Sequence, residues 1–503
     1  MDNVNKEEFQ NSLTHHMTRG GAIVLSFAFL ATPIGYFTRM LYSRSLSIEM
    51  FGLIYAMIAF FALLSSFNDL GFGYSVSYLV PKFIKKHQKR KAWNTYKYDQ
   101  IIEVSTALLL SFILFFSADF LAEYYFKVDI AADIIKILLF YFVAESVISA
   151  MNKFFIGLQQ EGYYSSIQVV RLGLVLFFST IFFMSGRSNI VWYAIAWSLA
   201  HLMTADIYRF ILHKKNSTLV HKVSWDKPLF LKMLQYALPT LFVSSLGLIS
   251  RTMDNMLLVL FEDLTQVGIY NIVISLALIS PIFLSPLSNI IFPLISKLED
   301  EPAKLKKLIE VLLKIIPFVA FYFAFFIFLF PEPILQTMFG SKWMNIAKSP
   351  LQIAVLVYIL NPISNLFSII TNGLGLIAEK TKISSALLTL KLILVSISTY
   401  LFGLNGMLLS SGLVFTASIL AHYSINRKKG HYSLPIKTYM SLIGIGLIIY
   451  IITRLIGFMP HGIIELILTG AIYTAIYIIF GFSLGIVDHK SILLIVKNRN
   501  NFK

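Results

Sequence analysis

Six charged side chains lie inside long apolar stretches of this 503-residue chain, where a charge is costly and needs a physical reason. Placing such a charge at the centre of a membrane helix costs at least about 2.5 kcal/mol. An arginine fork matches phosphate oxygens with two hydrogen bonds, lysine acts as a point charge, and intramembrane carboxylates serve ion transfer. The six residues are Arg39, Glu145, Arg171, Arg251, Asp254 and Lys391.

These residue types predict an anion site and an ion-coupling site within one membrane cavity. The carboxylates Asp254 and Glu145 are predicted to couple transport to a sodium ion or a proton. Two further acids, Asp69 and Asp206, lie closer to the ends of their stretches. The four cations are predicted to bind an anionic substrate such as a lipid pyrophosphate: Arg39, Arg171, Arg251 and Lys391.

A purely structural interpretation of the same charges stays open. Long cations near the ends of a span can reach the lipid headgroups while their stems stay in the apolar layer. Arg251 and Asp254 are three residues apart and share one helix face, so they can also form a neutral pair within that helix.

Two common signatures of enzymes are absent from the sequence. There is no phosphate-binding GxxxxGK[ST] loop and no HExxH motif. The chain has no cysteine, which excludes disulfides and cysteine-based metal sites. We therefore predict a protein that is not an enzyme and that has neither a cofactor nor a metal site.

Fourteen apolar stretches carry these charges, and each is long enough to cross a bilayer, which takes about 20 residues. Apolar residues make up 57% of the chain, and the runs are continuous rather than alternating, which favours helices over a β-barrel. We predict an all-α integral membrane protein with about 14 transmembrane helices. The stretches are 20–42, 49–80, 100–122, 131–157, 164–185, 190–212, 233–260, 265–297, 308–330, 347–375, 380–402, 405–427, 434–456 and 462–487.

The distribution of lysine and arginine predicts the orientation. With the N-terminus inside, the cytoplasmic loops hold 28 of these residues and the opposite loops hold four. Positive residues in short loops stay cytoplasmic, so both termini are predicted to lie in the cytoplasm. The basic residues of 82–91 are then mainly an orientation signal that also contacts the lipid headgroups of the cytoplasmic (inner) membrane. With the charge placed in this way, the formal charge of +16 does not indicate a nucleic-acid partner, and none is expected.

The two halves of the chain resemble each other. FGLIYAMIAFFALLS begins at Phe51 and VGIYNIVISLALIS begins at Val267, which aligns Gly52 with Gly268. Six helices per repeat give both repeats the same orientation, so we predict two six-helix lobes related by an axis along the membrane normal, with a central cavity. The predicted segments are an N-lobe at 20–213, a cytoplasmic linker at 214–231, a C-lobe at 232–427 and two extra C-terminal helices at 434–487.

Two stretches resemble the polysaccharide-transport branch of the multidrug/oligosaccharidyl-lipid/polysaccharide exporter superfamily, which includes the Wzx-type O-antigen flippases. Residues 38–83 resemble the opening of that family, with an arginine-ended first helix, Phe-Gly before helix 2 and Asp-Leu-Gly near its end. Residues 236–276 resemble its seventh helix, with Leu-Pro at the start, Asp254 in the middle and Gly-Ile-Tyr opening helix 8.

This resemblance implies a flippase that moves a lipid-linked oligosaccharide or polysaccharide precursor to the outer leaflet by alternating access. Fourteen helices are similar to the larger members, including the peptidoglycan-precursor flippases. Two alternatives stay open. An ion-coupled multidrug exporter of the same superfamily would use buried carboxylates, and a membrane glycan polymerase or ligase would need a larger outer loop than residues 331–347 provide.

Overall fold

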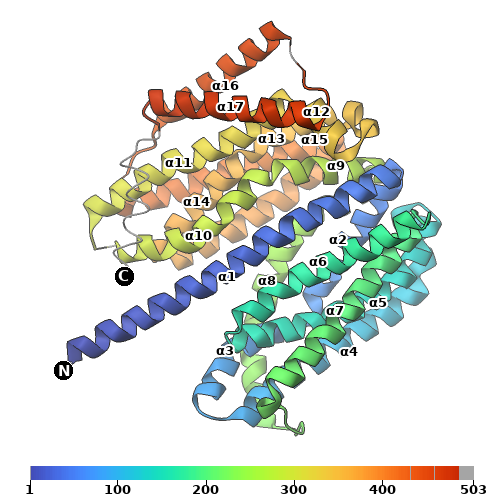
Figure 1. The fold of residues 1–503 in the computed structure, drawn as a ribbon. Helices are drawn as coiled ribbons and strands as arrows, with labels where there is room; N and C mark the ends of the chain where they lie inside the picture. Colours follow the sequence, from blue (N-terminus) through green and yellow to red (C-terminus); the bar gives the residue numbers. More distant parts are fainter. Residues whose placement is uncertain (1, 299, 431, 458, 487–503) are drawn as a thin grey trace. The chain divides into compact units, whose positions relative to one another are not determined.

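The computed structural model describes residues 2–298, 300–430, 432–457 and 459–486, and all regular elements in these ranges are helical. Packing divides the chain into two units, which we call unit 2, His15–Gly268, and unit 1, Ile269–Lys503 with Met1–Thr14. Figure 1 shows the helices along the chain.

Eleven helices in the described residues are long and apolar enough to cross a membrane, so the chain is a multi-pass membrane protein. This number does not confirm the predicted fourteen. One of the eleven, Ile377–Arg427, contains two of the predicted stretches. The stretches at 233–260 and 265–297 are helical, but they contain no span among the eleven.

Unit 2 is built from helices that pack as an all-α bundle. In chain order they are α1 (Asp2–Ser45, which belongs to this unit from His15 on), α2 (Ile48–Asn68), α3 (Phe72–Lys85), α4 (Lys89–Leu121), the π-helical η1 (Ala122–Phe126), α5 (Ile130–Gly157), α6 (Glu161–Met184), α7 (Ile190–Lys215), the 3-10 turn η2 (Ser217–Leu219) and α8 (Lys227–Phe261). Side chains set several of the starts: Ser47, Asn189 and Asp226 each accept a hydrogen bond from a backbone N–H in the first turn of α2, α7 and α8.

The predicted single stretch 49–80 is wrong, because the chain breaks at Asp69–Gly71 into α2 and α3. Leu70 and Gly71 have φ angles of 45° and 81°, which end a right-handed helix. The mean hydropathy of the stretch did not reveal this break, because only Asn68 and Asp69 interrupt the apolar run before Leu-Gly-Phe. The Asp-Leu-Gly motif is therefore a turn between two helices.

A second glycine permits a close backbone approach near the start of α2. A β-carbon on Gly52 would lie 1.8 Å from the carbonyl oxygen of Leu264 and 3.0 Å from the nitrogen of Gly268. No side chain fits there, so glycine is required for packing. Gly52 therefore packs against the backbone of residues 264–268, the segment that contains Gly268, its equivalent in the sequence alignment. The repeat itself stays a prediction.

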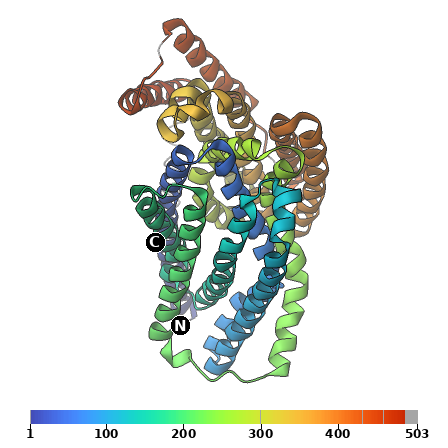
Figure 2. The same cartoon turned by 90° about the vertical axis from the view of Figure 1, so that its right-hand side faces the viewer.

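The segment between α7 and α8 lies against the start of α4 (Figure 2). The Tyr98 hydroxyl donates to the Ser224 carbonyl at 2.6 Å and accepts from the Asp226 N–H at 2.7 Å. The Asn94 amide donates to the same carbonyl at 3.0 Å. This part of the predicted linker thus has a fixed course over unit 2, and α8 packs on α2 and α3. The predicted lobe boundaries stay a prediction.

Unit 1 continues with shorter helices and then a long folded-back one. They are α9 (Leu264–Ala277), which begins in unit 2, α10 (Ile279–Lys297), α11 (Pro302–Leu329), α12 (Pro331–Phe339), the 3-10 turn η3 (Ser341–Trp343), α13 (Met344–Tyr358), α14 (Leu360–Gly373), α15 (Ile377–Gly430), α16 (Ile436–Ile456) and α17 (Ile463–Ser483). Within α15, Gly403 is not helical, with φ 59° and ψ −146°.

Two further features of unit 1 are the reversal within α15 and the packing of the last two helices. A β-carbon on Gly406 would lie 2.2 Å from the carbonyl oxygen of Ser398, although a straight helix would separate these residues by about 12 Å. The chain therefore reverses near Gly403. The last two helices pack on α11, where the Tyr477 hydroxyl donates to the Phe318 carbonyl at 2.8 Å.

Candidate functional site

Two groups of charged side chains lie among the helices of unit 2. The first, the acidic cluster, consists of Asp69, Asp99, Glu103 and Lys153. The second, the arginine cluster, consists of Glu145, Arg171 and His201. Each cluster joins different helices, so each is a product of the fold and not of one sequence motif.

Lys153 of α5 is the centre of the acidic cluster. Its ammonium lies 2.8 Å from Asp69 Oδ2 and 3.2 Å from Glu103 Oε1. The Glu103 side chain is 2% exposed, while Lys153 and Asp69 are each 20% exposed. The lysine thereby connects the end of α2 with the middle of α4.

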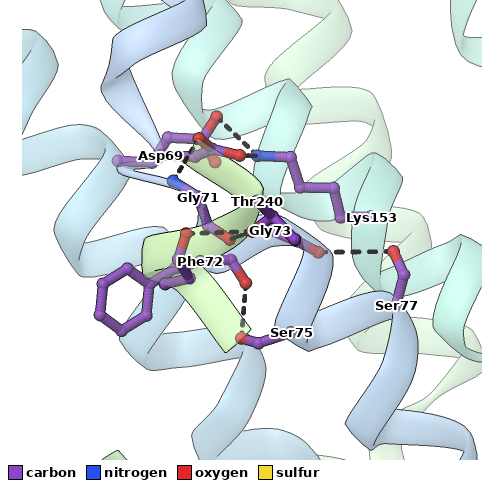
Figure 3. Close-up of polar contacts among 10 residues, drawn as sticks. Asp69, Gly71, Phe72, Gly73, Ser75, Ser77, Lys153 and Thr240 are labelled. Atoms are coloured by element: carbon purple, nitrogen blue, oxygen red, sulfur yellow. Dashed lines mark hydrogen bonds and ion pairs between the residues drawn. The ribbon is translucent and has the colours of Figure 1, made fainter. Parts of the chain in front are cut away.

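The turn between α2 and α3 fixes Asp69 in this position (Figure 3). Its Oδ2 accepts from Lys153, and its Oδ1 accepts from the Gly71 N–H at 2.9 Å. Gly71 in turn packs on α8, where the Thr240 hydroxyl donates to its carbonyl at 3.1 Å. A β-carbon on Gly71 would lie 2.2 Å from the Ala237 carbonyl oxygen. The Lys153–Asp69 ion pair, the α2–α3 turn and α8 are therefore tightly packed together.

Gly73 makes room for the lysine itself. A β-carbon at this position would come within 2.3 Å of Lys153 Cδ and 2.4 Å of its Nζ. The sequence Asp-Leu-Gly-Phe-Gly thus supplies the acid that pairs with Lys153. Its two glycines leave room for the backbone of α8 and for the lysine side chain to pack against the turn. This is a physical reason for the motif that the sequence alone showed only by resemblance.

Asp99 is the member of the acidic cluster without a partner of its own. It lies one turn before Glu103 on α4 and is 0% exposed. Neither of its carboxyl oxygens has a hydrogen-bond partner among the described residues. The charged groups that act on it are Lys153, Glu103 and Asp69. A buried polar group without partners is costly, and it identifies this place as unusual.

The arginine cluster is, by contrast, internally balanced. One guanidinium nitrogen of Arg171 on α6 lies 2.8 Å from both carboxylate oxygens of Glu145 on α5, and Arg171 also donates to Gln168. His201 of α7 places Nε2 3.7 Å from Glu145, while its Nδ1 lies 2.7 Å from the Trp197 carbonyl. One acid and one arginine cancel here.

Arg39 of α1 lies against an aromatic ring. Its Nε donates to the Tyr55 hydroxyl at 3.3 Å, and its guanidinium carbon lies 4.8 Å from the centre of the same ring. Among the residues that the structure describes, we find no carboxylate paired with Arg39. This leaves most of its hydrogen-bonding capacity for another anion.

The remaining predicted site residues are placed less completely. Asp254 lies in α8 and is buried, with 5% exposure. The backbone of Arg251 belongs to the same helix, but its side chain lies outside the described residues, so their predicted pairing is not tested. Lys391 is half-buried in α15 of unit 1. The structure therefore brings Glu145 and Arg171 together, and the binding roles of all six residues stay predictions.

Sequence reasoning missed three of the four residues of the acidic cluster. Asp99 falls just outside the predicted stretch 100–122, and Glu103 and Lys153 lie near the ends of theirs. A charge near the end of a span can reach water, so its position alone does not single it out. The available signal was the pair of acids one turn apart on a stretch that continues the helix, since α4 starts eleven residues before the predicted stretch.

The described residues contain no group of three or more histidine and acidic side chains arranged to hold a metal ion. The acidic cluster includes a lysine, whose ammonium occupies the place that a cation would take. The interactions observed in the acidic cluster are ion pairs between its own side chains.

Comparisons by sequence agree with this architecture. The family model described as polysaccharide biosynthesis protein matches residues 17–299. An uncharacterized membrane protein of Methanocaldococcus jannaschii is 24% identical over 481 residues, which cover 92% of this chain and 94% of that protein. The likeness therefore runs through both units.

Solved structures with a similar fold include two kinds of membrane protein. The lipid II flippase MurJ, in an inward closed conformation, matches with a TM-score of 0.68 at 16% identity and covers 91% of this chain and 98% of MurJ. An inward-facing multidrug resistance MATE family transporter of the MOP superfamily matches with a TM-score of 0.65 at 15% identity, covering 82% and 98%. The fold is that of the MOP exporters.

Proposed function

The chain belongs to the polysaccharide biosynthesis protein family, and from this premise we propose that it is a flippase for a lipid-linked glycan precursor. The cargo would be an oligosaccharide or polysaccharide precursor on an isoprenoid pyrophosphate, moved to the outer leaflet by alternating access. The observation that carries the proposal is the family match over 17–299, in a chain with the fold of the lipid II flippase MurJ.

The cations inside the helices support an anionic cargo. Arg39 lies in a membrane helix and faces a tyrosine rather than a carboxylate among the described residues. A guanidinium in such a place can bind two phosphate oxygens at once. Arg171 is a weaker candidate because Glu145 already accepts from it. Arg251 and Lys391 complete the proposed set.

The experiment is transbilayer movement in vesicles that contain the purified protein. A fluorescent isoprenoid-pyrophosphate sugar is inserted in both leaflets, and a membrane-impermeant quencher reports the fraction that reaches the outside. We expect wild-type protein to accelerate this movement. Arg39→Ala should weaken apparent substrate affinity by about 10-fold or more, the value of one charged hydrogen bond, and Arg39→Lys should retain part of it. Movement no faster than in empty vesicles would contradict the proposal.

An ion-coupled multidrug exporter is the second candidate, favoured by the buried carboxyl groups Asp99 and Glu103. The same vesicles distinguish the two functions. Export of a cationic dye without movement of the lipid-linked sugar would favour the multidrug function. A glycan polymerase or ligase would instead lengthen or transfer the sugar, which chromatography of the recovered lipid would reveal.

The proposed orientation has both termini and the Lys89 segment in the cytoplasm of a cell with this protein in its inner membrane. Because the chain contains no cysteine, a single cysteine at Lys89 or Ser341 can report its side of the membrane. An impermeant thiol reagent on intact cells should label the cysteine at Ser341 and leave the one at Lys89 unlabelled. The reverse pattern would overturn the orientation.

A further inference from the structure

The acidic cluster of unit 2 contains more acids than cations. Asp69, Asp99 and Glu103 surround one ammonium group, that of Lys153. If every group were ionised, the cluster would carry two excess negative charges in a largely buried place. Burying an uncompensated charge costs several kcal/mol even after the protein relaxes, so at least part of this excess must be neutralised.

The hydrogen bonds identify which acids are already neutralised. Asp69 accepts both from Lys153 and from the Gly71 N–H, so its negative charge is well stabilised. Glu103 shares the same lysine at a longer distance of 3.2 Å. Asp99 has neither contact and no exposure to water. The excess charge therefore falls on the α4 pair, Asp99 and Glu103.

Among the residues that the structure describes, no cation other than Lys153 forms an ion pair with Asp99 or Glu103. Tyr96, one turn before Asp99 on α4, is buried beside the cluster, and Arg209 of α7 acts on that tyrosine. The elements that supply charged groups to Asp99 are α4 itself, α5 and the turn after α2. A proton can neutralise the excess negative charge of this pair, because it requires no shell of ligands. The described residues form no group that could hold a metal ion in its place.

We propose that the acidic cluster is a proton-binding site, in which Asp99 and Glu103 share one proton that the protein exchanges with water during its cycle. The carboxylate takes up a proton to become a carboxylic acid, and the O–H bond breaks again when the proton returns to water. The use of this exchange to drive transport rests on the proposed function, while the proton site itself does not.

The site is connected to a helix that leads out of the cluster. When the proton leaves, the α4 pair gains a negative charge and attracts Lys153 more strongly, at the expense of its 2.8 Å bond to Asp69. Asp69 holds the turn whose Gly71 packs on α8 through Thr240. Loss or gain of the proton therefore changes the forces on the contact between the α2–α3 turn and α8, the helix that also carries Asp254.

Infrared difference spectroscopy of the purified full-length protein in lipid tests this directly. A protonated carboxyl group absorbs at a higher frequency than a carboxylate and shifts in heavy water, so titration from about pH 5 to about pH 9 reports buried groups that titrate in this range. We expect a carboxyl band in the wild type that Asp99→Asn removes and Glu103→Gln removes or shifts. Asp119→Asn is the matched control, because Asp119 is on the same helix and 77% exposed.

Each outcome decides the proposal. Absence of a titrating carboxyl band in the wild type, or a band that persists unchanged in both variants, overturns the proton site. A band that disappears when sodium is added at constant pH would show that the site prefers a metal ion and would also overturn it. If the band behaves as expected but no lipid-linked sugar moves in vesicles, the proposed function fails and the proton site stands.

Discussion

The acidic cluster and the arginine cluster lie in the same unit and differ in one respect, the balance of their charges. In the arginine cluster, Glu145 and Arg171 cancel, and His201 completes the contacts. In the acidic cluster, one lysine faces three acids. A balanced pair can exist for structure alone, whereas a buried group with an excess of acids needs a further neutralising partner, for which we propose a proton. Charge inside a membrane helix is therefore informative only together with its partners.

Removal of the lysine gives the largest expected effect. Lys153→Met leaves the acids of the cluster without their cation, and breaking a buried ion pair costs about 3–5 kcal/mol. We discount this for the 20% exposure of the lysine and expect a loss of about 2–4 kcal/mol. The thermal stability of the protein in detergent and its abundance in membranes measure this effect.

Lys136→Met is the matched control for that variant. Lys136 pairs with Asp119 at 3.2 Å, but the acid is 77% exposed. Exposed pairs contribute about 0–1 kcal/mol, so this variant should keep near wild-type stability. Equal losses in the two variants would show that the acidic cluster is no more strongly coupled than a surface ion pair.

The second effect concerns the turn that connects the acidic cluster with α8. Gly71→Ala should destabilise the protein for two reasons, the positive φ of 81° and the overlap of the new β-carbon with the Ala237 carbonyl oxygen at 2.2 Å. Gly186→Ala is the control that isolates the effect of positive φ. Gly186 has a φ of 75°, but nothing lies within 4 Å of a β-carbon at that position, so no overlap adds to the backbone strain. We expect about 1 kcal/mol for Gly186→Ala and clearly more for Gly71→Ala. Similar losses would mean that the contact with α8 relaxes freely.

The third effect probes the balance of the arginine cluster. Glu145→Gln leaves Arg171 without its acid and should cost about 1–3 kcal/mol, the penalty for an unsatisfied partner of a charged bond. The double variant with Arg171→Gln should recover most of that loss, because neither charge then remains. A double-mutant cycle of melting temperatures gives the coupling. If the double variant is stable yet moves no lipid-linked sugar, at least one of the two roles predicted from the sequence is supported, substrate binding by Arg171 or ion coupling by Glu145.

The sequence predicted the fold class well because long apolar runs allow few alternatives. It placed helices correctly at 131–157, 164–185 and 190–212, each within three residues of the observed bounds. It failed at the break at Leu70–Gly71, where Asn68 and Asp69 interrupt the apolar run only briefly. It also failed where a helix continues past its apolar part, as α4 does before residue 100. Both failures concern the same place, the acidic cluster.

The candidate site was harder to predict for a related reason. The free-energy cost of a charge in a membrane selects residues in the middle of apolar runs, such as Glu145 and Arg171. These two residues form an ion pair in the structure. Asp99 and Lys153 are separated by more than fifty residues and lie near span ends, so only packing reveals that they share one buried place. Residues that meet from different helices have no characteristic spacing in the sequence by which their contact could be recognised.

The most direct test of the account compares transbilayer movement of the lipid-linked sugar with and without an imposed pH gradient. Vesicles are prepared with wild type, Asp99→Asn or the control Asp119→Asn, with each variant checked for a native melting transition. The account predicts that the gradient changes the rate for wild type and Asp119→Asn, while Asp99→Asn moves the sugar at a rate that does not respond to it. A response of Asp99→Asn equal to that of the wild type would contradict the assignment of proton exchange to the acidic cluster.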